Sequence, residues 1–204
     1  MIRMTKMVTS AAFAASTILA NGAAGANLVD NGKFANVGKV YVENTSQGAD
    51  DLLTPGATDI PGWTNVGGPN GTGNEMWIQP HNTYGLTSSP ANPGGFFVDL
   101  TGEGPVQPYG GLEQSIATTA GQKYVMTFYL GGDSYYDAHP PVLIAHAGHA
   151  SGSYTFTPTG RNQWVRETLD FTAYGSSTVI KFRGKSYSPN FYIGLDSVSV
   201  RPRH

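Results

Sequence analysis

Residues 123–130, KYVMTFYL, decide the fold class because their side chains alternate strictly. The even-numbered positions are all large and apolar, namely Tyr124, Met126, Phe128 and Leu130. The odd-numbered positions on the other face are Val125, Thr127 and Tyr129. Successive side chains of a β-strand point to opposite faces, so the pattern predicts a strand with one face in a core. TVIKFRG, residues 178–184, alternates in the same way, and one-sided strands of this kind are typical of antiparallel sheets.

Other short β-rich runs lie on both sides of this strand, separated by turn residues. Helical periodicity is almost absent after residue 26, and the 27 glycines and 13 prolines fall mostly between the runs. About ten strands with regular turns predict an all-β antiparallel sandwich or barrel in a single domain. The runs are NLVDNGKF (27–34), GWTNV (62–66), EMWIQ (75–79), GGFFVDL (94–100), GLEQSI (111–116), PVLIAHA (141–147), GSYTFTP (152–158), QWVRETLDFTA (163–173), STVIKFRG (177–184) and FYIGLDSVSV (191–200).

Two stretches resist a complete assignment, residues 35–60 and the Gly-, Pro- and Asn-rich residues 65–95 around Trp77. Long loops on an all-β scaffold are where binding surfaces usually lie, so we expect them to matter for function.

The first 26 residues predict a signal peptide. Arg3 and Lys6 form a positively charged start, residues 7–20 are a modest apolar stretch, and AGA at 24–26 supplies the small residues that a signal peptidase needs. The apolar run is too short and too rich in Ser and Thr for a membrane-spanning helix. We therefore expect cleavage near Ala26, a secreted or periplasmic protein, and one β-sandwich domain over residues 27–204.

The mature chain would be mildly acidic, with ten Lys and Arg against fourteen Asp and Glu. A general nucleic-acid-binding protein would be basic, so nucleic acid is not an expected partner. There is no cysteine, so an exported chain would depend on packing, or on a metal, rather than on disulfides. Seven of the ten basic residues lie in the last 44 positions, and we interpret them as solvent-facing charges that guard strands against aggregation.

The segment YIGLDSVSV, residues 192–200, changes phase at Asp196. Its apolar side chains are Ile193 and Leu195 before the change and Val198 and Val200 after it. Either a β-bulge inserts a residue there, or Asp196 points inward on the same face as the two valines. An inward carboxylate is costly unless backbone N–H groups, a cation or an ion partner satisfies it.

Six segments occur together in an order and spacing that resembles a known family. They are NLVDNGKF, IPGWTNV, FFVDLTG, GGLEQSIATTAGQKYVMTFYLGGD, WVRETLDFTA and GLDSVSV. They resemble the galactose-binding-like jelly-roll family of plant cell-wall domain-of-unknown-function proteins and bacterial choice-of-anchor C exported proteins, over about residues 27–200. The resemblance implies a jelly-roll β-sandwich of the carbohydrate-binding-module type, secreted and non-catalytic. Anchored relatives carry a C-terminal sorting segment, whereas this sequence ends at VSVRPRH, so we expect free secretion.

The resemblance also implies that the last strand runs beside the first, which would place Asp196 near the Asn31-Gly32 turn. Two partners for its carboxylate are then open. A structural calcium would need six to eight oxygen ligands, with Asp196 as the anionic one. Backbone N–H groups could serve instead without a metal. Related sugar-binding jelly rolls often place Glu where this sequence has Ala35, which removes one plausible calcium ligand.

Catalytic chemistry has weak support in the sequence. No GxSxG elbow and no cysteine nucleophile occur. The two carboxylates of a glycosidase would have to come from a small set of acids, which we interpret as turn formers: Asp99, Glu103, Glu113, Asp133 and Asp137.

A transition-metal site would rest on the histidines of DAHPPVLIAHAGHASG, residues 137–152. They are His139, His146 and His149, but HxxH without a partnering Glu is not a zinc-protease motif. Along a strand that spacing sends the two imidazoles to opposite faces, so ordinary loop and strand-end histidines are the favoured interpretation.

Carbohydrate binding has the better physical basis, because sugar rings stack on aromatic side chains and their hydroxyls pair with polar ones. We expect Trp63, Trp164, Phe128 and Phe182 to be structural. Loop aromatics and their neighbours are the candidates for ligand contact, namely Tyr135, Tyr136, Asp133, Asp137, His81, Tyr84, Tyr109 and Tyr187.

We hypothesise a secreted carbohydrate-binding module-like protein that recognises cell-wall or extracellular-matrix polysaccharide. A structural or adhesive matrix protein and, less favoured, a glycan-active hydrolase are the alternatives.

Overall fold

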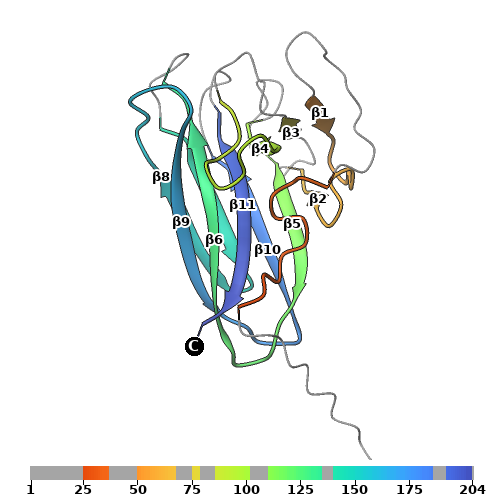
Figure 1. Cartoon of the computed structure of the whole chain (residues 1–204). Coiled ribbons are helices and arrows are strands. Elements are labelled where there is room, and N and C mark those ends of the chain that lie inside the picture. Colours follow the sequence, from red (N-terminus) through yellow and green to blue (C-terminus); the bar gives the residue numbers. More distant parts are fainter. Residues whose placement is uncertain are drawn as a thin grey trace, which may run out of the picture.

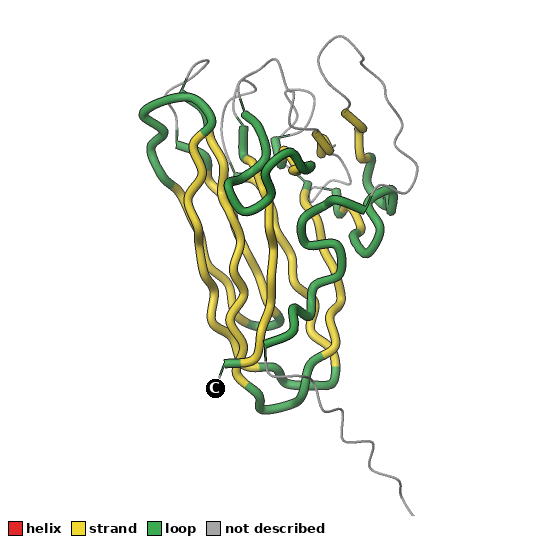
Figure 2. Tube along the Cα trace, viewed as in Figure 1, coloured by secondary structure: helices red, strands yellow, loops and turns green. Residues whose placement is uncertain are grey.

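The chain folds as an antiparallel jelly-roll β-sandwich (Figure 1). The alternating segments predict the antiparallel sandwich, and the family resemblance implies the jelly roll. The computed structural model describes residues 25–36, 50–67, 75–78, 86–101, 110–134, 140–185 and 192–203. One sheet, called sheet A, has the strand order β1-β3-β4-β11-β6-β9, and sheet B has the order β2-β5-β10-β7-β8. The described residues contain strands and loops and no helix, so no helical membrane span occurs among them (Figure 2).

The eleven strands differ widely in length. Their bounds are β1 (Asp50–Leu53), β2 (Thr64–Asn65), β3 (Glu75–Ile78), β4 (Phe97–Asp99), β5 (Gly111–Ala117), β6 (Lys123–Gly132), β7 (Val142–Ala147), β8 (Ala150–Thr155), β9 (Gln163–Thr172), β10 (Ser177–Gly184) and β11 (Gly194–Pro202). The long strands β6, β9, β10 and β11 form the body of the sandwich.

The core lies between the sheets and is built from the apolar faces that alternation predicts. Tyr124, Met126, Phe128 and Leu130 of β6 are buried, and from sheet B Ile180 and Phe182 of β10 face them. Phe128 packs edge-on against Phe182, with ring centroids 5.1 Å apart. Trp63 stacks at a tilt on Phe34, at 5.5 Å, and is almost fully buried. The structural role predicted for Trp63, Phe128 and Phe182 is therefore confirmed.

The sequence predicts a strand over NLVDNGKF, residues 27–34, and this prediction is wrong. The segment does lie beside the last strand, as the resemblance implies. Residues 25–36 form successive turns beside β11. Leu28 N–H donates to the Val200 carbonyl (2.9 Å), and Val198 N–H donates to the Gly32 carbonyl (2.7 Å). The Asn27 side chain accepts from Val200 N–H (2.9 Å). Side-chain and turn bonds thus replace a regular ladder, while β1 occupies part of the stretch that showed no strand pattern.

The phase change in β11 is a β-bulge. Asp196 pairs with Tyr129 of β6 and Ser199 pairs with Thr127, so two residues of β11 oppose the single residue Phe128. One of the two, Ser197, has a φ of 52°, the left-handed conformation that a bulge can require. Leu195, Val198 and Val200 can then all face the core. Asp196 falls on the opposite, outer face of sheet A, yet its side chain is fully buried.

Residues 86–96 bury Asp196, because this segment crosses the outer face of β11 (Figure 1). Beneath it lies a second, small apolar cluster, separate from the inter-sheet core: Leu86, Phe97, Trp164 and Tyr192. Trp164 lies edge-to-face with Phe97 at 5.8 Å and donates its indole N–H to the Thr87 carbonyl (2.9 Å). Its ring rests over Gly131 and Gly194, which leave room for it because they have no Cβ.

We predict that Gly32→Ala destabilises the fold, because an added methyl would overlap the Val198 carbonyl, a backbone group that cannot move aside alone. The N-terminal segment would have to shift away from β11, at a cost of about 1–3 kcal/mol. Thermal unfolding followed by circular dichroism measures this loss. Gly160→Ala is the matched control, since a Cβ there meets only ordinary contacts. Equal melting temperatures for both variants would contradict the docking of residues 25–36.

Candidate functional site

The carboxylate of Asp196 is held by donors from two segments of the chain. Oδ2 accepts the Ser89 N–H (2.8 Å), and Oδ1 accepts the Asn92 amide (3.1 Å). The N–H of Ser197, in the bulge itself, also donates to Oδ1. Asn92 further donates to the carbonyls of Lys33 and Phe96, both at 2.9 Å. Through Asn92 the carboxylate therefore connects β11, residues 86–96 and the N-terminal segment.

Burial raises the pKa of Asp196 to about 6, although its hydrogen bonds with Ser89, Ser197 and Asn92 act in the opposite direction. Asp99 of β4 behaves alike: burial raises its pKa to about 6 against hydrogen bonds from Thr101 and Ile193. Both acids thus accept hydrogen bonds in a buried position, where the loss of water disfavours the charged carboxylate.

The surroundings of Asp196 agree with the hydrogen-bonded alternative rather than with calcium. Calcium needs several oxygen ligands around it, whereas both oxygens of this carboxylate receive N–H donors. The predicted neighbour Gly32 lies close to β11, but its carbonyl accepts Val198 N–H. The groups that surround this carboxylate in the described residues are hydrogen-bond donors, which a cation site would not have pointing inward. We therefore assign no metal-dependent step to this residue, and the calcium prediction waits for the chelation experiment below.

The acids considered for glycoside hydrolysis have structural partners where the structure describes them. Asp99 accepts the Thr101 hydroxyl (2.6 Å) and the N–H groups of Thr101 and Ile193. Asp133 is buried and accepts Asn162 N–H (3.2 Å). Glu113 forms an ion pair with Lys181 (2.9 Å). Glu103 and Asp137 lie outside the described residues.

The described histidines do not form a cluster. His146 is half-buried on the outer face of β7, and burial together with Lys181 and Arg183 lowers its pKa. His149 is exposed in the turn after β7 and lies edge-on to Tyr174, at 4.9 Å. Within the described part of the chain no group of three potential metal ligands occurs. His139 lies outside it.

Of the predicted ligand-contact residues, only Asp133 lies within the described residues, and its carboxylate anchors the loop that contains Asn162. The others lie outside, namely Tyr135, Tyr136, Asp137, His81, Tyr84, Tyr109 and Tyr187.

The described residues that flank these candidates share one end of the sandwich. Gly194 pairs with both Gly131 and Asp99, and Gly184 pairs with Leu143. The side chain of Leu86 lies against Gly194. The topology, and not the sequence, brings these described residues to one end of the sandwich.

A second surface, which the sequence analysis missed, is the open outer face of sheet A below residues 86–96. We call it the basic face and define it by the outward side chains of three neighbouring strands. They are Lys123, Val125, Thr127 and Tyr129 of β6, Arg166, Thr168, Asp170 and Thr172 of β9, and Ser199 and Arg201 of β11 with Arg203 after it. Register fixes the rows, because Tyr129 pairs with Arg166, Thr127 with Ser199 and Thr168, and Val125 with Arg201 and Asp170.

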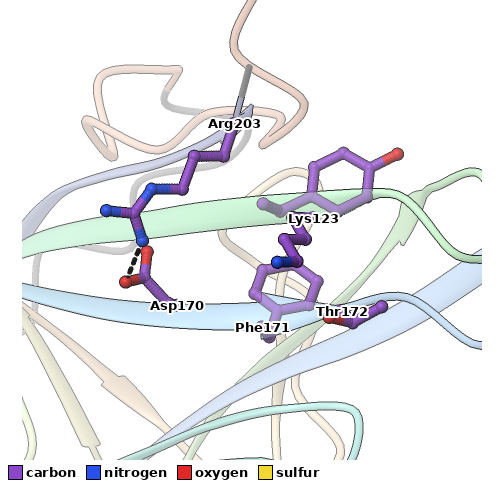
Figure 3. Close-up of a pocket in the computed structure, with 6 residues that line it drawn as sticks. Lys123, Asp170, Phe171, Thr172 and Arg203 are labelled. Carbon is purple, nitrogen blue, oxygen red and sulfur yellow. Dashed lines mark hydrogen bonds and ion pairs between the residues drawn. The ribbon is translucent and has the colours of Figure 1, made fainter.

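The lower end of the basic face contains a shallow pocket of about 220 Å³ (Figure 3). Lys123, Asp170, Thr172 and Arg203 line it from the outer face, and Arg203 forms an ion pair with Asp170. Tyr124 and Phe171 also border it, but their stacked rings, with centroids 5.3 Å apart, belong to the core and are almost fully buried. The pocket thus offers mainly charged groups to a ligand.

The signal for the basic face was present in the sequence as the odd-numbered face of KYVMTFYL and the basic C-terminal residues. What the sequence lacked was the pairing of β6 with both β9 and β11, three segments distant in the chain. From the sequence alone we therefore interpret these cations as charges that guard strands against aggregation, and not as one surface.

No protein-family model matches this sequence, and no curated protein matches it. Solved structures do resemble the fold. The K1 cleaved adhesin domain of Lys-gingipain from Porphyromonas gingivalis is 16% identical with a TM-score of 0.51, and the match covers 77% of this chain and all of that one.

Two further structures are more distant. The K3 adhesin domain of the same protein is 15% identical over 69% of this chain and 92% of that one, with a TM-score of 0.47. A xylan-binding domain from Paenibacillus barcinonensis is 14% identical over 75% and 92%, with a TM-score of 0.41. At these identities the likeness concerns the fold.

We predict that Asp196→Asn lowers the melting temperature. The amide would turn an NH2 group toward N–H donors, leaving Ser89 N–H or the Asn92 amide without an acceptor, at a cost of about 1–3 kcal/mol. Differential scanning calorimetry measures the change, and Asp59→Asn at an exposed position is the matched control. Glycan binding should be unchanged in the folded variant, since Asp196 is fully buried.

Chelation decides between the two partners of Asp196. Excess EDTA should leave the melting temperature of the wild type unchanged. A fall in melting temperature, with calcium found by elemental analysis, would support the metal instead.

The stabilising effect of Asp196 relative to asparagine should depend on pH. Its pKa is about 6 in the folded protein, above the usual 3.8, so the folded state binds the proton more tightly than the unfolded state. The advantage over Asp196→Asn should therefore be largest near pH 4 and decrease as the pH rises through about 6. Unfolding of both proteins at several pH values gives this difference directly. A difference that grows with pH would show that the hydrogen bonds outweigh the burial.

Proposed function

We propose that this protein is a secreted, non-catalytic carbohydrate-binding protein that recognises cell-wall or extracellular-matrix polysaccharide. The proposal rests on one observation, the open array of polar side chains around Tyr129 on the basic face. Cleavage of the first 26 residues and export are parts of the same proposal.

The polar groups of this array are free to accept a ligand. The side chains of Thr127, Thr168 and Ser199 lie in one row across three strands, and none makes a side-chain hydrogen bond to a described residue. Tyr129 lies next to this row, half-buried, with Arg166 opposite. An aromatic ring beside hydroxyls and a guanidinium matches the apolar faces and hydroxyl edges of sugar rings.

The position of the array on strands also favours binding. Side chains of a sheet interior have fixed spacing, so little conformational freedom is lost when a rigid, extended ligand is bound. The loop tyrosines, which lie outside the described residues, remain a second candidate for ligand contact.

The absence of catalysis is part of the proposal because the described acids are engaged elsewhere. A glycosidase needs two carboxyls facing a common cleft. Asp99 and Asp133 instead accept backbone N–H groups while buried.

A structural or adhesive role is the second candidate, favoured by exposed apolar side chains on sheet B. Val179 of β10 is 47% exposed and Tyr174, in the turn before it, is 74% exposed. Such residues suit contact with a protein partner. Self-assembly that depends on concentration, without any glycan bound, would favour this role.

We predict that Tyr129→Ala weakens polysaccharide binding about tenfold, since loss of one stacking aromatic typically costs on the order of 1–2 kcal/mol. Affinity electrophoresis against a panel of neutral and acidic polysaccharides, with thermal unfolding to verify the fold, gives the measurement. Tyr174→Ala removes an exposed tyrosine outside the basic face and is the matched control.

The double variant Tyr135→Ala/Tyr136→Ala tests the other region. If it abolishes binding while Tyr129→Ala retains it, the loops and not the basic face bind the glycan. If no polysaccharide binds the wild type, the proposed function is wrong.

A further inference from the structure

Four cations surround the array on the basic face, and one carboxylate accompanies them. The cations are Lys123, Arg166, Arg201 and Arg203. On the outer faces of the described strands β6, β9 and β11, Asp170 is the acidic side chain that is open to solvent. It is engaged by Arg203, which leaves the charges of Lys123, Arg166 and Arg201 without an ion partner there.

Protection against aggregation does not explain this distribution. Charges that guard a sheet belong on its edge strands, where backbone groups are unpaired. Arg166 is on the edge strand β9, but Lys123 is on β6, which pairs with β11 and β9 on its two sides. Arg201 is on β11, whose other side is bonded near Val200 to Leu28 of the N-terminal segment. Like charges on one face repel each other, so an anionic ligand would relieve a cost that the free protein carries.

The spacing of the cations suits a chain of anions rather than a single one. Tyr129 and Lys123 are six residues apart on one strand, about 20 Å at the usual rise. Arg166 and Arg201 lie on strands two spacings apart, about 10 Å, and their rows are four residues apart along β6, about 13 Å. The face is therefore long and narrow. At its lower end Lys123 and Arg203 line the pocket that Figure 3 shows.

We propose that the basic face binds an acidic polysaccharide through its carboxylate or sulfate groups. This inference rests on the proposed function and names its ligand class. Arg166 and Arg201 contact the anionic groups, Tyr129 stacks on a sugar ring, and the hydroxyls of Thr127 and Ser199 pair with sugar hydroxyls. Arginine suits the task because its planar guanidinium binds such anions in a bidentate manner.

Other polyanions fit the surface less well. Single-stranded nucleic acids are bound by several aromatic side chains on which successive bases stack, whereas the basic face has one, Tyr129. A row of hydroxyls beside one aromatic ring is suited to sugar edges rather than to lipid head groups.

The test compares the wild type with Arg166→Gln/Arg201→Gln by isothermal titration calorimetry. The probes are polygalacturonate for carboxylates, dextran sulfate for sulfates and dextran as the neutral control. Arg183→Gln/Lys185→Gln removes two cations from the other sheet and its following loop, so it is matched in charge. Thermal unfolding verifies that each variant is folded.

We expect one or both acidic polymers to bind the wild type at least tenfold more tightly than dextran at low salt. The Arg166/Arg201 variant should lose most of this preference while the control variant retains it, and about 0.5 M NaCl should weaken acidic binding strongly. The polymer that responds identifies the carboxylate or the sulfate as the recognised group.

Three outcomes would overturn the inference. Equal binding of acidic and neutral polymers would reject acid recognition and leave the proposed function intact. Loss of binding in both double variants would show a general charge effect. Tighter binding to duplex DNA or to phosphatidylserine vesicles than to any polysaccharide would identify another partner, and no binding to any polysaccharide would reject the proposed function as well.

Discussion

The buried carboxylate of Asp196 is the interaction on which the arrangement of sheet A depends. It lies on the outer face, where a charged side chain would ordinarily be in water, yet residues 86–96 enclose it. Three donors stabilise the carboxylate in this buried position, namely Ser89 N–H, Ser197 N–H and the Asn92 amide. A buried carboxylate without those donors would be far more costly.

The same network divides the outer face of sheet A into two parts. In the upper part residues 86–96 cover the cluster of Leu86, Phe97, Trp164 and Tyr192, which would otherwise expose apolar surface. The lower part stays open and has the polar and basic side chains. The bulge is the reason that both parts can exist, because it returns Val198 and Val200 to the core after Asp196 has turned outward. The proposed site thus begins where the covering segment ends.

The proposed binding role agrees with which polar groups of the described residues are engaged and which are open. Asp99 and Asp196, whose pKa values burial raises to about 6, accept hydrogen bonds from backbone N–H groups. The open groups on the basic face are hydroxyls, guanidinium groups and a phenol, and the proposed binding role rests on these. The pocket at the lower end of the face adds the cations Lys123 and Arg203 to the same array.

The sequence by itself determined the strands and their inner faces. Alternation in KYVMTFYL and STVIKFRG predicted which side chains are buried, because a period of two is a local property of an extended chain. It also located the irregularity at Asp196, where the alternation changes phase. It did not reveal β1, and it mistook the turns of residues 25–36 for a strand, because both are stabilised by distant partners.

Only the tertiary structure decided what each polar residue faces. Asp196 could have pointed inward or lain on a bulge, and the choice followed from register with β6 and from coverage by residues 86–96. The basic residues were visible in the sequence, but strand order placed Lys123, Arg166 and Arg201 on one surface. Strand order depends on pairings between segments far apart in the chain, and no local pattern encodes those pairings.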